Sequence, residues 1–392
     1  MERTNSIAKI STSDFISSAV SKYVESNFSF SLWRLPNSNV IHLAASQHPS
    51  LLTEINLEEV NPGFLFASFD PLKEKIHLPS DEYYTFESGQ LASSKGSLGE
   101  DILAKRIAKE SKLTPYYASN RSQGIQTNEN SYKSLVTKCV DEVIRRNFEK
   151  IVPSRSKTIV LPGDFDLIGT FNKLCQLYPN GMISVFSSPL TGTWVGATPE
   201  ILVGISKDQQ FHTVAVAGTQ AYEEGADLRS ISWTQKDIEE QALVERYIIS
   251  CFKKIRLREY EEQGPKTIIA GNVLHLKTDF TVDMVATNFP QLGSIMLKLL
   301  HPTSAVCGMP LEASLRFLKE NEGYDRQFYS GYLGPVNIEG ESNLYVNLRC
   351  MQLFANDAIL YAGAGVMADS DPEKEWKETE MKMNTLDRTI RK

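Results

Sequence analysis

Two pairs of acidic residues in this chain have the spacing of carboxylates that share one face of a helix. Asp237 and Glu240 form one pair, and Glu375 and Glu378 form the other. Side chains three positions apart lie on the same side of an α-helix. Mg²⁺ prefers carboxylate oxygens, keeps several waters and leaves room for an anionic substrate. Each pair alone is typical of a solvated acidic face near a helix N-terminus, whereas the two pairs together would suit a magnesium site if their helices meet.

Other polar residues fit ordinary structural roles when each is considered alone. Gly363 and Gly365 follow an apolar run, but the chain contains neither GxGxxG nor GxxxxGK[ST], so a nucleotide site is only weakly indicated. Arg349 lies in the strand-like run LYVNLRC, where it could be solvated or could hold a carboxylate with both arms of its guanidinium. His275 and His301 have no second histidine at ligand spacing, which favours satisfied polar groups over metal ligands.

Both acidic pairs fall in predicted helices with recognisable starts. A helix from about 234 to 252 begins with Thr234 and Asp237, the spacing of a capping box that uses Asp instead of Glu. A last helix from about 372 to 389 begins after Asp371, a good N-cap residue. These two helices would have to bring the acidic pairs together.

The rest of the pattern mixes long strand-like runs with separate helices. This mixture favours an α+β architecture over a regular βαβ alternation. Further helical spacing is found at 131–146, 291–300 and 311–320, and strand-like runs occupy most of the remaining chain after residue 149.

The composition is that of an ordinary globular protein and argues against several functions. Of the 392 residues 41% are hydrophobic and 23% are charged, and the formal net charge is −7, so the basic footprint of a nucleic-acid-binding protein is missing. Five isolated cysteines indicate neither a zinc site nor a disulfide framework. The N-terminus has no long apolar segment and no run of about 18 apolar residues exists. We therefore expect a cytoplasmic protein with no membrane or nucleic-acid partner.

The N-terminal third carries no clear motif. Residues 85–131 are poor in large apolar residues and rich in Ser, Lys, Asn and Gln, which predicts a mobile polar segment with one short helix at 102–110. The pattern changes at Tyr132. We expect residues 1–131 to form a variable N-terminal part and residues 132–388 to form the catalytic region.

Nine stretches, in order, resemble the chorismate-utilising enzymes, which include isochorismate synthase, salicylate synthase, anthranilate synthase component I and aminodeoxychorismate synthase. The resemblance covers roughly residues 132–388 and implies one large α+β domain, with two antiparallel β-sheets packed face to face and helices outside. The matching stretches are EKIVPSR (149–155), VGATPEILV (195–203), VAVAGTQ (214–220), QKDIEEQ (235–241), NVLHLKT (272–278), LHPTSAVCGMP (300–310), FYSGYLG (328–334), LYVNLR (344–349) and AGAGVMADSDPEKEWKETEMK (362–382).

The resemblance implies a magnesium site made of the two acidic pairs. Glu240 and Glu378 would coordinate Mg²⁺ directly, and Asp237 and Glu375 would act mainly through metal-bound water. This chain departs from the family pattern at Gln241, where a histidine is common, and at Asp237, where a glutamate is frequent. The shorter Asp237 side chain suits a water-mediated role.

The resemblance also implies how chorismate, the expected small-molecule partner, is held. Cationic and hydroxyl groups together with backbone donors would bind the two carboxylates of this dianion. No obligate protein partner is expected. The implied substrate-binding residues are Gly218, Thr219, His275, Ala305, Tyr329, Arg349, Gly363, Gly365 and Lys382.

Two residues match the family's catalytic acid and base. Lys150 would act as general base on a water molecule, and Glu200 would act as general acid that protonates the departing hydroxyl. A base at neutral pH needs a lysine whose pKa is lowered by burial or by a nearby cation, and an acid needs a glutamate whose pKa is raised by desolvation. Without the resemblance, Lys150 would be taken for an ordinary surface lysine.

Three positions choose among the family's reactions. Ammonia-using members generally have Gln where this chain has Lys150, which favours water as the nucleophile. Aminodeoxychorismate synthases often carry a nucleophilic lysine where this chain has Ala217. Salicylate synthases tend to carry Thr where this chain has Ala305. The resemblance therefore implies a magnesium-dependent isomerase, isochorismate synthase, which serves menaquinone or siderophore biosynthesis. A salicylate synthase and a non-catalytic chorismate-binding relative are the alternatives.

Overall fold

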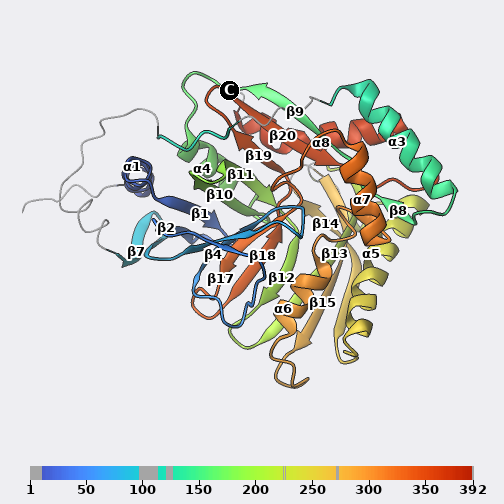
Figure 1. Ribbon diagram of the computed structural model, residues 1–392, viewed down its shortest axis with the longest axis horizontal. Coiled ribbons are helices and arrows are strands. Elements are labelled where there is room, and N and C mark those ends of the chain that lie inside the picture. The colour runs from blue at the N-terminus through green and yellow to red at the C-terminus, as the bar shows by residue number, and fades with distance from the viewer. Residues whose placement is uncertain are drawn as a thin grey trace, which may run out of the picture.

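Two large β-sheets form the centre of the molecule. The computed structural model describes residues 11–96, 114–120, 127–223, 225, 227–270 and 273–390. Within these residues, each of the two sheets has nine strands, and every paired strand is antiparallel to its neighbour. Figure 1 shows the two sheets side by side with helices around them. The predicted α+β fold with two antiparallel sheets is confirmed.

Sheet A has the strand order β7-β6-β2-β1-β10-β11-β19-β20-β9. Its strands are β1 (Ser29–Arg34), β2 (Ile41–Ser46), β6 (Glu82–Glu87), β7 (Gln90–Lys95), β9 (Ser154–Val160), β10 (Met182–Ser188), β11 (Gly192–Thr198), β19 (Cys350–Leu353) and β20 (Asp357–Gly363).

Sheet B has the strand order β14-β15-β13-β12-β18-β17-β4-β5-β3. Its strands are β3 (Ser50–Leu52), β4 (Gly63–Ala67), β5 (Lys75–Pro79), β12 (Ile201–Ile205), β13 (Gln210–Ala221), β14 (Glu261–Ala270), β15 (Val273–Asp283), β17 (Tyr332–Val336) and β18 (Ser342–Val346). A separate ribbon pairs β8 (Lys150–Ile151) with β16 (Gly308–Met309).

Most of the described helices begin where the sequence supplies a capping side chain, and α6 and α7 are the exceptions. Thr234 and Asp237 form the predicted capping box at the start of α5, and the Asp371 carboxylate accepts a hydrogen bond from the Lys374 backbone at the start of α8. The described helices are α1 (Thr12–Glu25), α3 (Glu129–Ile144), α4 (Leu167–Leu177), α5 (Gln235–Lys254), α6 (Leu292–Leu300), α7 (Leu311–Asn321) and α8 (Pro372–Ile390), with a short 3₁₀ turn, η1 (Leu228–Ser230). None of these helices is both long and apolar enough to span a membrane.

Three apolar clusters show that the layers are helix, sheet, sheet, helix. One cluster joins α1, α4 and α8 to sheet A, and another joins α3, α5, α6 and α7 to sheet B. The third lies between the sheets and is largely aromatic, with Trp33, Phe66, Phe186 and Trp194 among its members. Strands such as β10 and β11 are buried along their whole length. Because both of their faces are covered, they appear in the sequence as continuous apolar runs.

The N-terminal residues are built into both sheets. Strands β1, β2, β6 and β7 belong to sheet A, and β3, β4 and β5 belong to sheet B. The prediction of a mobile segment beginning at residue 85 is wrong for residues 90–95, which form β7 with one half-buried and five exposed side chains and pair with β6. Backbone pairing rather than burial holds this edge strand, so a count of large apolar residues does not detect it. The short helix predicted at 102–110 lies outside the described residues.

Candidate active site

Two of the four crossings that the described chain makes between the sheets each place a charged residue at the site. Glu200 lies between β11 of sheet A and β12 of sheet B, and Arg349 lies between β18 of sheet B and β19 of sheet A. The two crossings are hydrogen-bonded to each other. The Val346 backbone N–H donates to the Glu200 carbonyl at 2.9 Å, and the Ala197 N–H donates to the Arg349 carbonyl at 3.0 Å. This pairing fixes an acid and a cation beside each other at the junction of the sheets.

A pocket at this junction gathers most of the residues predicted for the site. Its empty space, mouth included, is about 650 Å³, which suits a small organic ligand. Walls come from both sheets, α5 and α8. The predicted residues that line it are Glu200, Gly218, Thr219, Glu240, His275, Ala305, Tyr329, Arg349, Gly363, Gly365 and Lys382. The other predicted residues, Lys150, Asp237, Glu375 and Glu378, do not line this pocket.

Arg349 differs from its predicted setting in a strand. Strand β18 ends at Val346, and Arg349 itself has a φ of +47°, in the left-handed region. A continuous strand cannot pass from one sheet to the other, so the backbone turns here and directs the side chain into the pocket. The guanidinium is buried, and its Nη2 donates to His275 Nε2 at 3.0 Å. A buried arginine in this position can hold a carboxylate.

His275 has its two ring nitrogens assigned by its neighbours. Its Nδ1 lies 2.6 Å from the Gly218 carbonyl and must donate to it, and its Nε2 accepts from Arg349. Burial, with the Arg349 charge as a second cause, lowers the pKa of His275 to about 3. The imidazole therefore stays neutral and positions both Arg349 and the Gly218 turn. The prediction that His275 is a satisfied polar group is consistent with these contacts.

Lys150 is fully buried beside Glu240. Its Nζ lies 2.8 Å from Glu240 Oε1 in an ion pair that lacks hydrogen-bond alignment, and Nζ has no other hydrogen-bond partner among the described residues. Of the two predicted surroundings of Lys150, burial or a nearby cation, burial is observed, and the charged group paired with its Nζ is a carboxylate. Burial on its own raises the pKa of Glu240, but Lys150, Lys236 and Lys382 together hold this pKa below its ordinary value.

Glu200 has the environment expected of a general acid. The side chain is buried, and burial raises its pKa to about 7 even though Lys150, Lys382 and Arg349 act in the opposite direction. A carboxyl group with such a pKa is partly protonated at neutral pH and can donate a proton. This agrees with the desolvation predicted for it.

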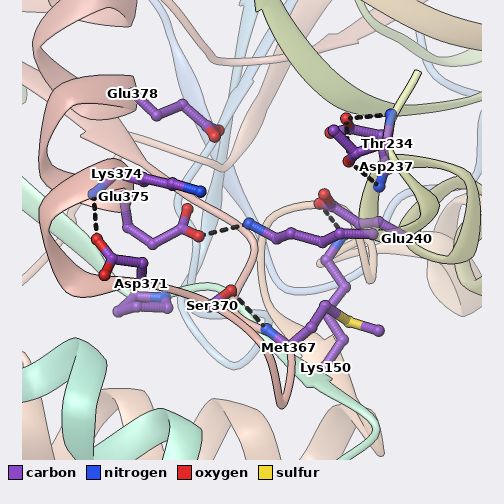
Figure 2. A network of polar contacts seen from close by, with 12 residues as sticks. Lys150, Thr234, Asp237, Glu240, Met367, Ser370, Asp371, Lys374, Glu375 and Glu378 are labelled. Atoms are coloured by element: carbon purple, nitrogen blue, oxygen red, sulfur yellow. Dashed lines mark hydrogen bonds and ion pairs between the residues drawn. The ribbon is translucent and has the colours of Figure 1, made fainter. Parts of the chain in front are cut away.

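The first turns of α8 present a row of charged side chains. Lys382 Nζ donates to Glu378 Oε1 at 2.6 Å and to the Gly363 carbonyl at 3.0 Å. Glu375 pairs through Oε1 with Lys236 of α5. Burial, and next the charge of Glu378, raise the pKa of Glu375 to about 7. Figure 2 shows Glu375 and Glu378 on one side of a gap and Asp237 and Glu240 on the other.

The donor chemistry fits a magnesium ion that retains waters. Among the described residues, Glu375 Oε2 is buried and has no hydrogen-bond partner, although the Ser370 hydroxyl is close enough to Glu375 to lower the pKa of this carboxyl group. Such an orphaned carboxylate oxygen calls for a cation or a water. No three acidic, histidine or cysteine side chains of the described residues are close enough to share one ion directly. Mg²⁺ commonly takes only one or two carboxylates and keeps its other waters, so this arrangement fits a water-rich site better than a closed protein cage.

The Asp237 carboxylate is hydrogen-bonded within the capping box of α5. Its Oδ2 accepts hydrogen bonds from the Thr234 backbone at 3.2 Å and from the Thr234 hydroxyl at 2.6 Å. The Asp237 Cβ also lies 3.2 Å from the position that a Cβ would take at residue 218. Gly218 has no Cβ and has a φ of +68°, so the backbone can turn close to Asp237. The capping box thus packs against the Gly218 turn and shapes it.

Two buried arginines support the site without being predicted for it. Arg326 donates to the Val152 and Val306 carbonyls, at 2.7 and 2.8 Å, and pairs with Glu322, so it ties together two segments that line the pocket. Arg155 stacks on Trp376 at 3.7 Å and holds α8 against β9. Arg155 lies in the matched stretch 149–155, and Arg326 lies just before the matched stretch 328–334. The spacing of residues within these stretches does not indicate partners so far away in the sequence.

Gly365 leaves the space that Lys150 and Glu240 occupy. A Cβ at this position would overlap the Glu240 carboxylate and come within 3.0 Å of Lys150 Cε. We predict that Gly365→Ala lowers kcat/KM by roughly 100-fold, because shifts of about 1 Å in reacting groups have effects of that size. Steady-state kinetics would measure this. Gly163→Ala is the matched control, since a Cβ there meets nothing within 4 Å. Normal activity of a folded Gly365→Ala protein would show that the close approach is not needed.

Known proteins resemble this chain in sequence and in fold. The family profile described as chorismate binding enzyme matches residues 91–391. A vibriobactin-specific isochorismate synthase of Vibrio cholerae is 28% identical over 261 residues, and the match spans 65% of this chain and 65% of that relative, slightly less than two thirds of its length.

Two solved structures share the fold. MenF, the menaquinone-specific isochorismate synthase from Escherichia coli, has a TM-score of 0.72 at 20% identity, covering 95% of this chain and 91% of MenF. Anthranilate synthase component I from Streptococcus pneumoniae has a TM-score of 0.67 at 17% identity, covering 92% of each chain. Since the names of these two proteins state different reactions, the shared fold does not decide the reaction, and individual residues have to.

Proposed function

The chain belongs to the family of chorismate-binding enzymes, and from this premise we propose that it is an isochorismate synthase. The observation that carries the proposal is the buried Glu200 of the pocket, whose pKa is raised to about 7 by burial, together with the buried Lys150, which pairs with another pocket residue, Glu240, and whose charge acts on Glu200. A lysine and a carboxylic acid of this kind can remove a proton from one group while supplying one to another. The relatives named isochorismate synthase support the same reaction.

The proposed reaction moves a hydroxyl group of chorismate from C4 to C2. The Lys150 amine takes a proton from a water molecule, whose oxygen bonds to C2. The two conjugated ring double bonds shift, the C4–oxygen bond breaks, and Glu200 gives its proton to the departing hydroxyl, which leaves as water. One water enters and one leaves, so the product is an isomer of the substrate. A proton then returns from Lys150 to Glu200.

The substrate is a dianion and needs cationic and hydrogen-bonding groups. Arg349 is oriented by His275, and Lys382 is held by the Gly363 carbonyl and by Glu378. We assign one substrate carboxylate to Arg349 and Tyr329, and the other to Lys382. In this assignment the turn at Gly218 and Thr219 supplies backbone donors.

Magnesium would bind beside these cations. Glu240 and Glu378 would hold it directly, and Asp237 and Glu375 would hold it through water. When bound, Mg²⁺ would neutralise carboxylate charge of the substrate and of the protein in a site rich in acidic groups. The orphaned Oε2 of Glu375 supports this assignment.

The pocket residues favour this reaction over its relatives. Ala217 and Ala305 both line the pocket, and neither can act as a nucleophile or as a hydrogen-bond donor through its side chain. A covalent lysine mechanism at position 217 is therefore out of reach. The apolar Ala305 gives no polar help to a subsequent loss of pyruvate.

Product analysis tests the proposal. Purified protein incubated with chorismate and Mg²⁺ should release isochorismate as its main product, which chromatography distinguishes from salicylate. Salicylate together with pyruvate as the main enzymatic products would identify a salicylate synthase instead. Binding of chorismate without turnover would identify a non-catalytic relative.

A further inference from the structure

We infer that Lys236 is a counter-ion built into the proposed metal site, and that a divalent cation has to displace its ammonium group to bind between α5 and α8. The inference rests on the proposed magnesium site and adds a residue that takes no part in converting the substrate. Lys236 lies on α5, one turn before Glu240, and its Nζ pairs with Glu375 Oε1 on α8. The ammonium thus joins the two helices where the ion would have to sit.

Lys236 differs from the other lysines of the site in having a single task. Lys150 pairs with Glu240 at 2.8 Å and Lys382 pairs with Glu378 at 2.6 Å. Both of these lysines also have roles toward water or substrate in the proposed reaction. Lys236 has neither role in the proposed reaction and does not line the pocket, and its ion-pair partner among the described residues is Glu375. The positive charge of Lys236 therefore acts to neutralise the acidic groups of the proposed metal site.

Glu375 is the carboxylate that most needs this charge. Its side chain is only 2% exposed, and its Oε2 has no hydrogen-bond partner among the described residues. Glu378 stands one helical turn away and faces the same gap in Figure 2. A buried carboxylate and a half-buried carboxylate beside it repel each other unless a cation lies near them. Lys236 supplies that cation when no metal is bound.

The ammonium group of Lys236 can also move away from Glu375. Its side chain is 21% exposed, whereas the side chain of Lys150 is 0% exposed. A flexible lysine stem with access to solvent can withdraw its charge into water. Without withdrawal, the ammonium would repel a divalent ion. At about 5 Å in water-like surroundings, this repulsion corresponds to roughly tenfold weaker metal binding.

Calorimetric titration of the whole protein with MgCl₂, in the absence of chorismate, tests the inference. Lys236→Met keeps the length of the side chain and removes its charge, and we expect it to bind Mg²⁺ roughly tenfold more tightly than the wild type. Lys236→Arg keeps the charge and should bind Mg²⁺ no more tightly than the wild type. Lys377→Met is the matched control, because Lys377 is 71% exposed on α8, the helix that carries Glu375, and pairs with Glu373. It should keep the wild-type affinity.

The response of thermal unfolding to MgCl₂ supplies a second readout, which the loss of a purely structural bridge would not change. In EDTA, Lys236→Met should unfold at a lower temperature, because Glu375 is left without a cation. Added MgCl₂ should then raise its Tm by more than it raises the wild-type Tm, since tighter binding stabilises the folded state more.

Equal or weaker Mg²⁺ binding by Lys236→Met, with an unchanged Tm response to MgCl₂, would overturn the inference even if chorismate is converted normally. Absence of Mg²⁺ binding in both proteins would overturn it together with the metal site. Failure of the proposed reaction is recognised separately, by the product analysis.

Discussion

Lys150→Ala should lower kcat by roughly 10³- to 10⁴-fold while chorismate still binds. General base catalysis contributes up to about 10⁴-fold to a rate, and the Lys150 amine is the group that we propose activates the water molecule. Lys150 is buried beside Glu240 and its charge also acts on Glu200, so no solvent base can easily replace it. Single-turnover kinetics would measure the loss, and substrate binding would be measured by calorimetry.

A matched lysine control separates loss of the base from loss of a charge in general. Lys298 is 78% exposed and pairs with Glu54 at the surface, so Lys298→Ala should retain wild-type activity. Turnover of Lys150→Ala within tenfold of the wild type would remove Lys150 from the base role. Because removal of Lys150 leaves Glu240 without its ion pair, the variant should be checked for folding by its circular dichroism spectrum before its kinetics are compared.

Glu200→Gln should lower kcat by roughly 10²- to 10⁴-fold, because glutamine keeps the shape of the side chain but has no acidic proton to give. In the wild-type protein the acid must be protonated to act. Since the pKa of Glu200 is raised to about 7, activity should fall as the pH rises above about 7. The pH profile of kcat/KM between pH 5 and 9 would measure this fall. The fall above about pH 7 should be missing from the profile of the Glu200→Gln variant, which has no carboxyl group to ionise at this position.

The same pKa makes a prediction for stability with a definite sign. A carboxyl group whose folded pKa lies above its unfolded value of about 4.5 is neutral in both states at low pH, so it costs nothing there. As the pH rises through this window the unfolded state ionises first, and the folded state becomes relatively less stable. Glu200→Gln should therefore raise Tm relative to the wild type more at pH 8 than at pH 4. Glu312→Gln, at an exposed position of α7, is the control and should show no such difference. An equal effect at both pH values would contradict the raised pKa.

Local patterns alone were enough to predict the parts of this protein that depend on near neighbours in the chain. The capping box of Thr234 and Asp237 and the Asp371 cap were predicted at the residues where α5 and α8 begin. Each involves atoms within three residues of each other, so spacing determines the contact. The family order of nine short motifs also predicted the two antiparallel sheets and most of the pocket. Motifs carry that information because they record which residues meet in related folds.

Contacts between distant segments were decided only by the tertiary structure. Arg349 was expected in a strand, but it lies at a crossing between sheets with a positive φ and meets His275, 74 residues earlier. Lys236 pairs with Glu375, 139 residues away, and the spacing within QKDIEEQ cannot indicate such a partner. Helical and strand periodicities state which face of an element a residue occupies, but not which other element covers that face. The packing of the two sheets decides which element faces which, and it places α5 opposite α8, bridged by the ion pair of Lys236 and Glu375, so that two ordinary acidic helices become opposite sides of one charged site.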